Sequence, residues 1–86
     1  MAEEEVTKIL EQLDELRPAM FDRLVDKYDT YGSIYQYESD KFLANLAKNY
    51  GQFVEAITYN DAIRIKVKGI DVMNVVLMLL KISGVK

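Results

Sequence analysis

The 86-residue sequence contains no cysteine, no histidine and no tryptophan, and it has one proline and four glycines. Without cysteine, the chain can form no disulfide and has no thiolate for nucleophilic catalysis or metal binding. Without histidine, it lacks the side chain that most often acts as general acid or base and as metal ligand. The four glycines stand apart, so there is no glycine-rich phosphate loop. We therefore expect no enzyme, no cofactor and no bound metal.

The length is that of one small domain, and we assign residues 1–86 to a single helical domain. Half of the residues are hydrophobic, which argues against disorder. A domain of this size without disulfides often completes its core by oligomerising.

Nothing in the sequence indicates a membrane or a secretory route. The first residues, MAEEEV, are acidic where a signal peptide would be basic. The longest apolar stretch, VMNVVLMLL at 72–80, is far shorter than the roughly 20 residues that span a bilayer. We expect a soluble, cytoplasmic protein that contacts no membrane.

The net charge of −3 is unevenly distributed along the chain. Residues 1–40 carry eleven acidic and four basic side chains, which gives −7, and residues 41–86 carry three acidic and seven basic side chains, which gives +4. Halves of opposite charge attract each other, either within one chain or head to tail between two copies.

Apolar residues at helical spacing predict a first helix over EEEVTKILEQLDELR. Pro18 interrupts it, because proline lacks an N–H and clashes with the carbonyl of Asp14. The apolar stripe nevertheless continues in phase beyond Pro18, so we expect a kinked helix that runs to about Tyr31. Gly32 then follows as a residue that can take a positive φ and end the helix.

A second helix is predicted over DKFLANLAKNYGQFVEAI, with Ser33 and Ser39 as competing start signals. Gly51 lies inside it and costs roughly 0.5–1 kcal/mol relative to alanine. The usual reason to keep such a glycine is the close approach of another helix.

Four of the six tyrosines fall in YDTYGSIYQY at 28–37, between these two helices. We expect their rings to pack at the corner where the helices meet, with hydroxyl groups reaching solvent or backbone. The alternative is a tyrosine-lined binding surface.

The last segment is ambiguous, because residues 62–69, AIRIKVKG, alternate between apolar and basic side chains as a strand does. A helix that begins at Asn60 as N-cap is the other interpretation, and we favour it because an isolated two-stranded sheet is poorly stable. The predicted fold class is therefore all-α, a bundle of three to four helices. The alternative is α+β, with short strands at 33–38 and 62–68.

Residues 72–80 are apolar on almost every side, and Asn74 is the one strong exception. A surface helix should have a polar face, so this helix must be covered on several sides. A helix fully enclosed in a monomer is one solution, but we expect a second copy of the chain or a larger partner to complete the bundle. Asn74 could fix the register of such a contact. The predicted interface comprises Val72, Asn74, Val76, Leu77, Leu79, Leu80, Arg64 and Lys68.

Two charged rows accompany this prediction. Asp22, Asp26 and Asp29 share one face of the first helix, and the basic pair Arg64 and Lys68 could dock on it. Alternatively, the basic stretch 64–68, which includes Lys66, could contact phosphates as a small nucleic-acid-binding or regulatory module. The pI of about 4.8 opposes this alternative, because nucleic-acid-binding domains are normally basic.

The run NDAIRIKVKGIDVMNVVLMLLKISG, following KFLANLAKNYGQFVEAI, resembles a family of small helical domains of unknown function. Members of that family are encoded beside formate dehydrogenase or heterodisulfide-reductase-like genes. The resemblance covers about the last 45 residues and rests on the spacing of leucine-like positions and a terminal Lys-x-x-Gly; it implies an accessory protein of a larger complex. We therefore predict a non-enzymatic protein–protein interaction module or accessory subunit that associates through its apolar C-terminal helix.

Overall fold

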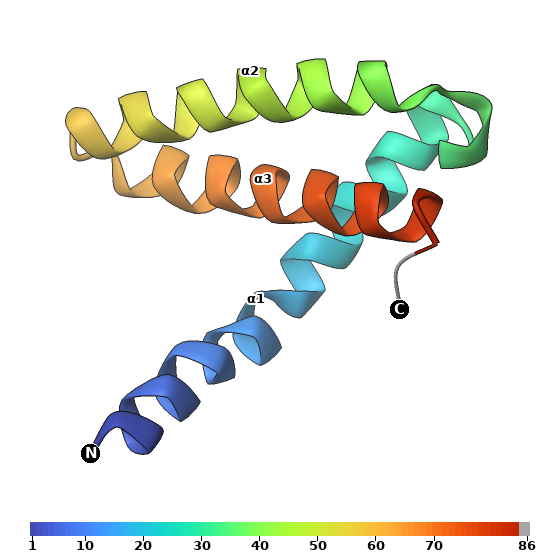
Figure 1. Ribbon diagram of the computed structural model, residues 1–86. Helices are drawn as coiled ribbons and strands as arrows, with labels where there is room; N and C mark the ends of the chain where they lie inside the picture. Colours follow the sequence, from blue (N-terminus) through green and yellow to red (C-terminus); the bar gives the residue numbers. More distant parts are fainter. Residues whose placement is uncertain (85–86) are drawn as a thin grey trace.

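The computed structural model describes residues 1–84, and in that range it contains three α-helices and one short 3₁₀ helix (Figure 1). Their bounds are α1 Ala2–Tyr31, η1 Ile34–Gln36, α2 Ser39–Thr58 and α3 Ala62–Ile82. The predicted all-α fold class is confirmed.

The alternative with strands at 33–38 and 62–68 is wrong, since residues 1–84 contain no strand. Residues 62–68 form the first turns of α3, because Asp61 caps this helix by accepting a hydrogen bond from the backbone N–H of Arg64 at 3.2 Å. Asn60, which we expected to be the cap, instead takes a φ of 52° and turns the chain out of α2. A local cap therefore outweighs the strand-like alternation of the side chains.

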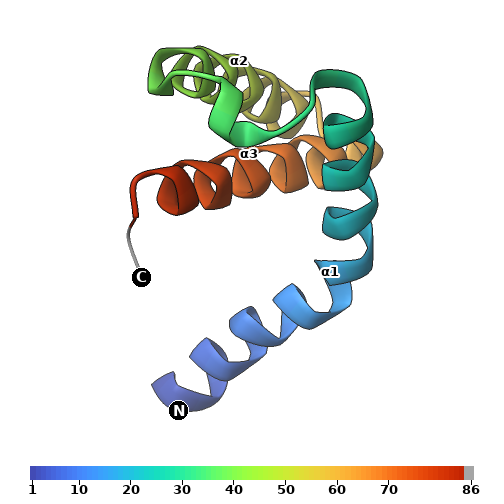
Figure 2. The ribbon, with the colours of Figure 1, turned by 90° about the vertical axis from the view of Figure 1, so that its right-hand side faces the viewer.

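Pro18 lies inside α1, which continues to Tyr31 as expected. Because Pro18 has no N–H, the carbonyl of Asp14 receives no helical hydrogen bond at this point. In Figure 2 the axis of α1 changes direction between its N-terminal half and its C-terminal half. Pro18 is thus a kink that joins two parts of one helix.

The helices are arranged as a hairpin with a third helix across it. α2 and α3 run antiparallel, side by side, while the C-terminal half of α1 packs against α3 (Figures 1 and 2). The N-terminal half of α1 extends away from both. None of the helices in residues 1–84 has the length and apolar character needed to cross a membrane.

The core is small for a chain of this length. A cluster of Ile34, Phe42, Val75 and Met78 joins η1, α2 and α3. Only ten of the described residues are buried, and three of these ten are Asn or Asp. This core leaves many large apolar side chains of the described chain in contact with solvent.

The corner between α1 and α2 confirms the predicted end of the first helix, because Gly32 takes a φ of 79°. Ser33 then caps η1 by accepting a hydrogen bond from the N–H of Tyr35. Of the four clustered tyrosines, only Tyr37 packs inward, edge-on to Phe42, while the other three are exposed. The prediction that these rings pack at the corner is therefore correct only for Tyr37.

The glycine that marks a close helix approach is Gly69 on α3. A Cβ at Gly69 would lie 3.2 Å from Cε1 of Phe53 on α2. At Gly51, where we expected the close approach, a Cβ would meet no atom within 4 Å. The interpretation of Gly51 as a packing glycine is wrong for the contacts within this chain.

This difference predicts opposite responses to two matched substitutions. Gly51→Ala should raise the free energy of unfolding by about 0.5–1 kcal/mol, because it adds helix propensity without a clash. Gly69→Ala should gain clearly less or lose stability, because the Phe53 ring must move. Urea unfolding followed by circular dichroism, at one fixed protein concentration, measures both, and equal gains would contradict the packing described here.

Candidate interaction site

The inner side of α3 is defined by its buried residues. They recur at positions i, i+1, i+4, i+5 and i+8, which places them on one side of the helix. The set comprises Ile70, Asp71, Asn74, Val75 and Met78. This side faces the chain's own core, so the opposite side is the one available to a partner.

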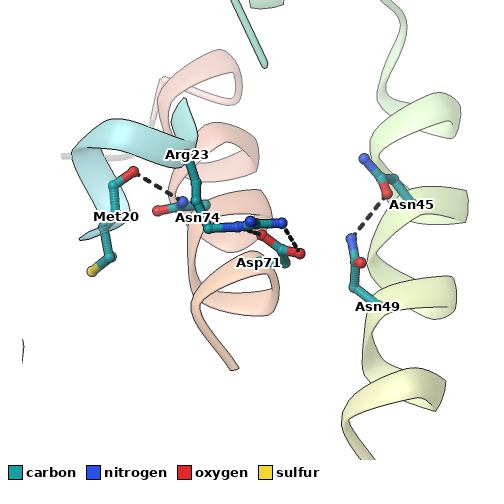
Figure 3. A network of polar contacts seen from close by, with 6 residues as sticks. All are labelled: Met20, Arg23, Asn45, Asn49, Asp71 and Asn74. Carbon is teal, nitrogen blue, oxygen red and sulfur yellow. Dashed lines mark hydrogen bonds and ion pairs between the residues drawn. The ribbon is translucent and has the colours of Figure 1, made fainter. Parts of the chain in front are cut away.

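An ion pair links α1 to this inner side of α3 (Figure 3). Arg23 donates from Nε to Oδ1 of Asp71 at 2.5 Å and from Nη2 to Oδ2 at 2.8 Å. Asp71 is only 3% exposed, and its hydrogen bonds raise the pKa of Arg23 further above its ordinary value. A two-pronged pair of this kind fixes orientation as well as charge.

This contact has the opposite polarity to the docking that the sequence suggested as a possibility. Arg64 and Lys68 of α3 could have docked on acidic residues of α1, but α1 supplies the base and α3 supplies the acid. Arg64 lies instead beside Glu55 of α2, with 3.6 Å between Nη1 and Oε1. Asp71 is the only acidic residue in residues 62–82, which carry four basic residues. The segment was therefore interpreted as a source of basic contacts, and no role was assigned to Asp71.

Asn74 makes the second polar contact between the same two helices. Its Nδ2 donates to the backbone carbonyl of Met20 at 3.2 Å, and both residues are buried (Figure 3). Its Oδ1 is buried without a hydrogen-bond partner in the described chain. We predicted Asn74 to lie in a contact with a partner, but here its amide serves the packing of α1 on α3.

The outward side of α3 carries an uncovered apolar row. Val76, Leu77 and Leu80 are 39–49% exposed, and half-buried Met73 extends the row to the spacing i, i+3, i+4, i+7. We call these four residues the α3 outer face. Two other predicted interface residues belong more to the chain itself, since Val72 is half-buried and Leu79 packs against the core cluster.

The basic stretch is divided by the helix. Arg64 and Lys68 lie one helical turn apart on one side, but Lys66 is rotated by about 200° from Arg64. Lys66 is exposed, while Arg64 and Lys68 are half-buried. This arrangement therefore does not favour contacts of all three side chains with adjacent phosphates.

A second uncovered apolar row lies on the first half of α1. All of residues 2–15, which we call the N-terminal arm, are exposed. Within the arm, four apolar residues that are 40–58% exposed have the spacing i, i+3, i+4, i+7. They are Val6, Ile9, Leu10 and Leu13. The arm also carries six acidic residues against one basic residue, a net charge of −5.

The arm is the surface that the sequence analysis missed. Its apolar residues served only to predict the first helix, and the stripe that continues beyond Pro18 was used to join the two parts of that helix. The available signal was Pro18, which separates an acidic amphipathic stretch from the part of α1 that packs.

Potential metal-ligating side chains are not clustered in the described residues. Among residues 1–84, no three or more Asp or Glu side chains gather in a way that could hold a metal ion. In comparisons with known proteins, the sequence matches no protein-family model, no curated protein and no solved structure.

The contact between α1 and α3 yields a quantitative prediction. Arg23→Met should lower the free energy of unfolding by about 3 kcal/mol, because it leaves the buried Asp71 carboxylate without its partner. Asp71→Asn alone should also destabilise. The double variant Arg23→Met, Asp71→Asn should lose clearly less than the two single losses added together. Chemical denaturation of all four proteins measures this coupling, and strictly additive losses would show that the pair does not act as a unit.

Proposed function

We propose that the protein is a non-enzymatic association module that forms a homodimer through the α3 outer face and the N-terminal arm. The observation that supports this most is that the arm and α3 each carry an uncovered apolar row of the same helical spacing and that their charges are opposite. A third row of this spacing, formed by Tyr50, Phe53, Val54 and Ile57, lies on α2, whose acidic and basic residues balance. A contiguous exposed apolar patch is typical of an interaction site, whereas apolar side chains exposed singly are normal on any protein surface. Two rows of equal spacing can pack side by side as helices do.

Charge favours the arm of a second copy as the occupant of the α3 outer face. The arm has a net charge of −5, whereas α3 carries four basic residues and one acid. That acid, Asp71, is already paired with Arg23, and one of the bases, Arg64, lies 3.6 Å from Glu55 of α2, which leaves Lys66, Lys68 and Lys81 to attract the arm. Lys81 follows the outer face directly, one turn after Leu77, where it can meet a carboxylate of the arm. Apolar and electrostatic complementarity therefore coincide on the same two surfaces.

If each copy packed its arm on the other copy, the apolar rows of both copies would be covered at once. In a two-fold dimer, the arm of each copy packs on α3 of the other, so every contact occurs twice. The arm is about 21 Å long at 1.5 Å per residue, and a single contact of that length would be small. Doubling the contact also leaves no free arm from which a chain of copies could grow.

The isolated arm also needs support. A helix of fewer than about 12–15 residues is marginally stable in water by itself. Pro18 removes a hydrogen bond at the junction that ties the arm to the rest of α1. Packing on a second copy supplies the tertiary contacts that the arm lacks within its own chain.

The oligomeric state tests the proposal. Light scattering at about 100 μM should give twice the chain mass of 9.9 kDa. Leu77→Glu with Leu80→Glu should give a monomer, because two carboxylates would be placed on the contact. Leu10→Glu with Leu13→Glu in the arm should do the same.

The matched control is Leu43→Glu with Val54→Glu, at two comparably exposed positions on α2. It adds the same charge away from both rows and should remain dimeric. Circular dichroism checks that each variant retains the α2–α3 hairpin. A monomeric wild-type chain would contradict the homodimer and leave the same surfaces to a larger complex. Dissociation of the control variant to the same extent would contradict the assigned contact.

A further inference from the structure

A hollow of about 250 Å³ lies at the corner where all four helical elements meet. It is bordered by the end of α1, by η1, by the beginning of α2 and by Met78 near the end of α3. The hollow shares none of its lining residues with the N-terminal arm or the α3 outer face. Its chemistry can therefore be considered apart from the proposed dimer.

One part of the wall is apolar and fixed. Ile34, Phe42 and Met78 line the hollow and belong to the core cluster, so each is at least nine-tenths buried. Tyr37 packs edge-on to Phe42, with 6.3 Å between ring centroids, and its hydroxyl donates to the backbone carbonyl of Tyr31. These contacts hold an apolar surface in place without any ligand.

Another part of the wall is cationic. Lys27 and Lys41 both line the hollow, and each ammonium group lies over a tyrosine ring of the same wall. Lys27 Nζ is 5.9 Å from the ring centroid of Tyr31, and Lys41 Nζ is 5.5 Å from that of Tyr37. Neither lysine pairs with a carboxylate within the described part of the chain. Their hydrogen-bond donors are therefore available to an anion.

An uncharged donor adds to these two cations. Asn45 also lines the hollow, and its Oδ1 accepts a hydrogen bond from Nδ2 of Asn49 at 2.9 Å (Figure 3). This leaves the amide N–H groups of Asn45 as donors. Two ammonium groups and an amide around an apolar floor match a ligand with one anionic end and one apolar end.

We propose that this hollow binds a small amphipathic carboxylate, with the anion between Lys27 and Lys41 and the apolar chain on Phe42 and Met78. A cavity of about 150 Å³ accommodates benzene, so a hollow of 250 Å³ suits an apolar body of roughly eight carbon atoms. A ligand of about ten non-hydrogen atoms on an open site should bind with a Kd on the order of 0.1–1 mM.

Octanoate is the probe that tests this proposal. The chain has four methionines, of which Met78 alone lines the hollow, so its ε-methyl NMR signal reports binding locally. Octanoate should shift this signal saturably while the Met1 signal stays in place. Acetate, which has the charge without the apolar body, and octan-1-ol, which has the body without the charge, should each bind at least about fivefold more weakly.

Two pairs of variants distinguish the specific effect of Lys27 and Lys41 from a general effect of the protein's net charge. Lys27→Gln with Lys41→Gln should weaken octanoate binding by about tenfold, because both ammonium groups are lost. Arg17→Gln with Lys48→Gln removes the same charge from exposed positions on α1 and α2 that do not line the hollow, and it should leave the Kd within about twofold.

Three results would overturn the proposal: no Met78 shift at 5 mM octanoate, octan-1-ol binding as tightly as octanoate, or equal weakening in both pairs of variants. Measuring the variants at a protein concentration where wild type and variants have the same mass keeps the result separate from self-association.

Discussion

Two polar contacts between α1 and α3 determine how the rest of the molecule is covered. Arg23 donates two hydrogen bonds to the carboxylate of Asp71, and the side-chain amide of Asn74 donates one to the backbone carbonyl of Met20. If the contact were apolar only, α1 could slide or rotate on α3 at little cost. A bidentate ion pair and a buried amide hydrogen bond are directional, so they favour one crossing position of the two helices. With α1 held there, its C-terminal half covers one side of α3 and α2 covers another. The third side of α3 remains in solvent.

The same constraint creates the other two surfaces of interest. Because α1 is fixed across α3 and kinked at Pro18, its first half is directed away from the hairpin and its apolar row finds no cover (Figure 2). Where α1 ends, the chain must turn through Gly32 and η1 to reach α2. The hollow lined by Lys27 and Lys41 lies at that corner, beside the core cluster.

Sequence reasoning succeeded where the signal is local. Apolar periodicity located the helices, and the phase of the stripe across Pro18 correctly indicated one kinked helix. Sequence reasoning failed for the contacts that depend on how the helices cross. Arg23 and Asp71 are 48 positions apart, and nothing nearby in the sequence distinguishes Asp71 as the partner of Arg23. The close approach at Gly69, and its absence at Gly51, likewise follow from the packing of Phe53. The lack of polar residues at 72–80 led to a predicted interface that includes the exposed Val76, Leu77 and Leu80 but also Asn74 and Leu79, which pack within the chain. The arm, which looked like an ordinary amphipathic helix, was not part of that prediction.

Amide hydrogen exchange at two protein concentrations tests most directly whether a second copy covers what the chain leaves exposed. At high concentration, the amides of residues 2–15 should exchange slowly. On dilution below the dimer midpoint they should approach the rate of an unprotected helix end, while the amides of 70–78 stay protected by the hairpin. An arm whose exchange rate is the same at both concentrations, whether fast or slow, would contradict the account.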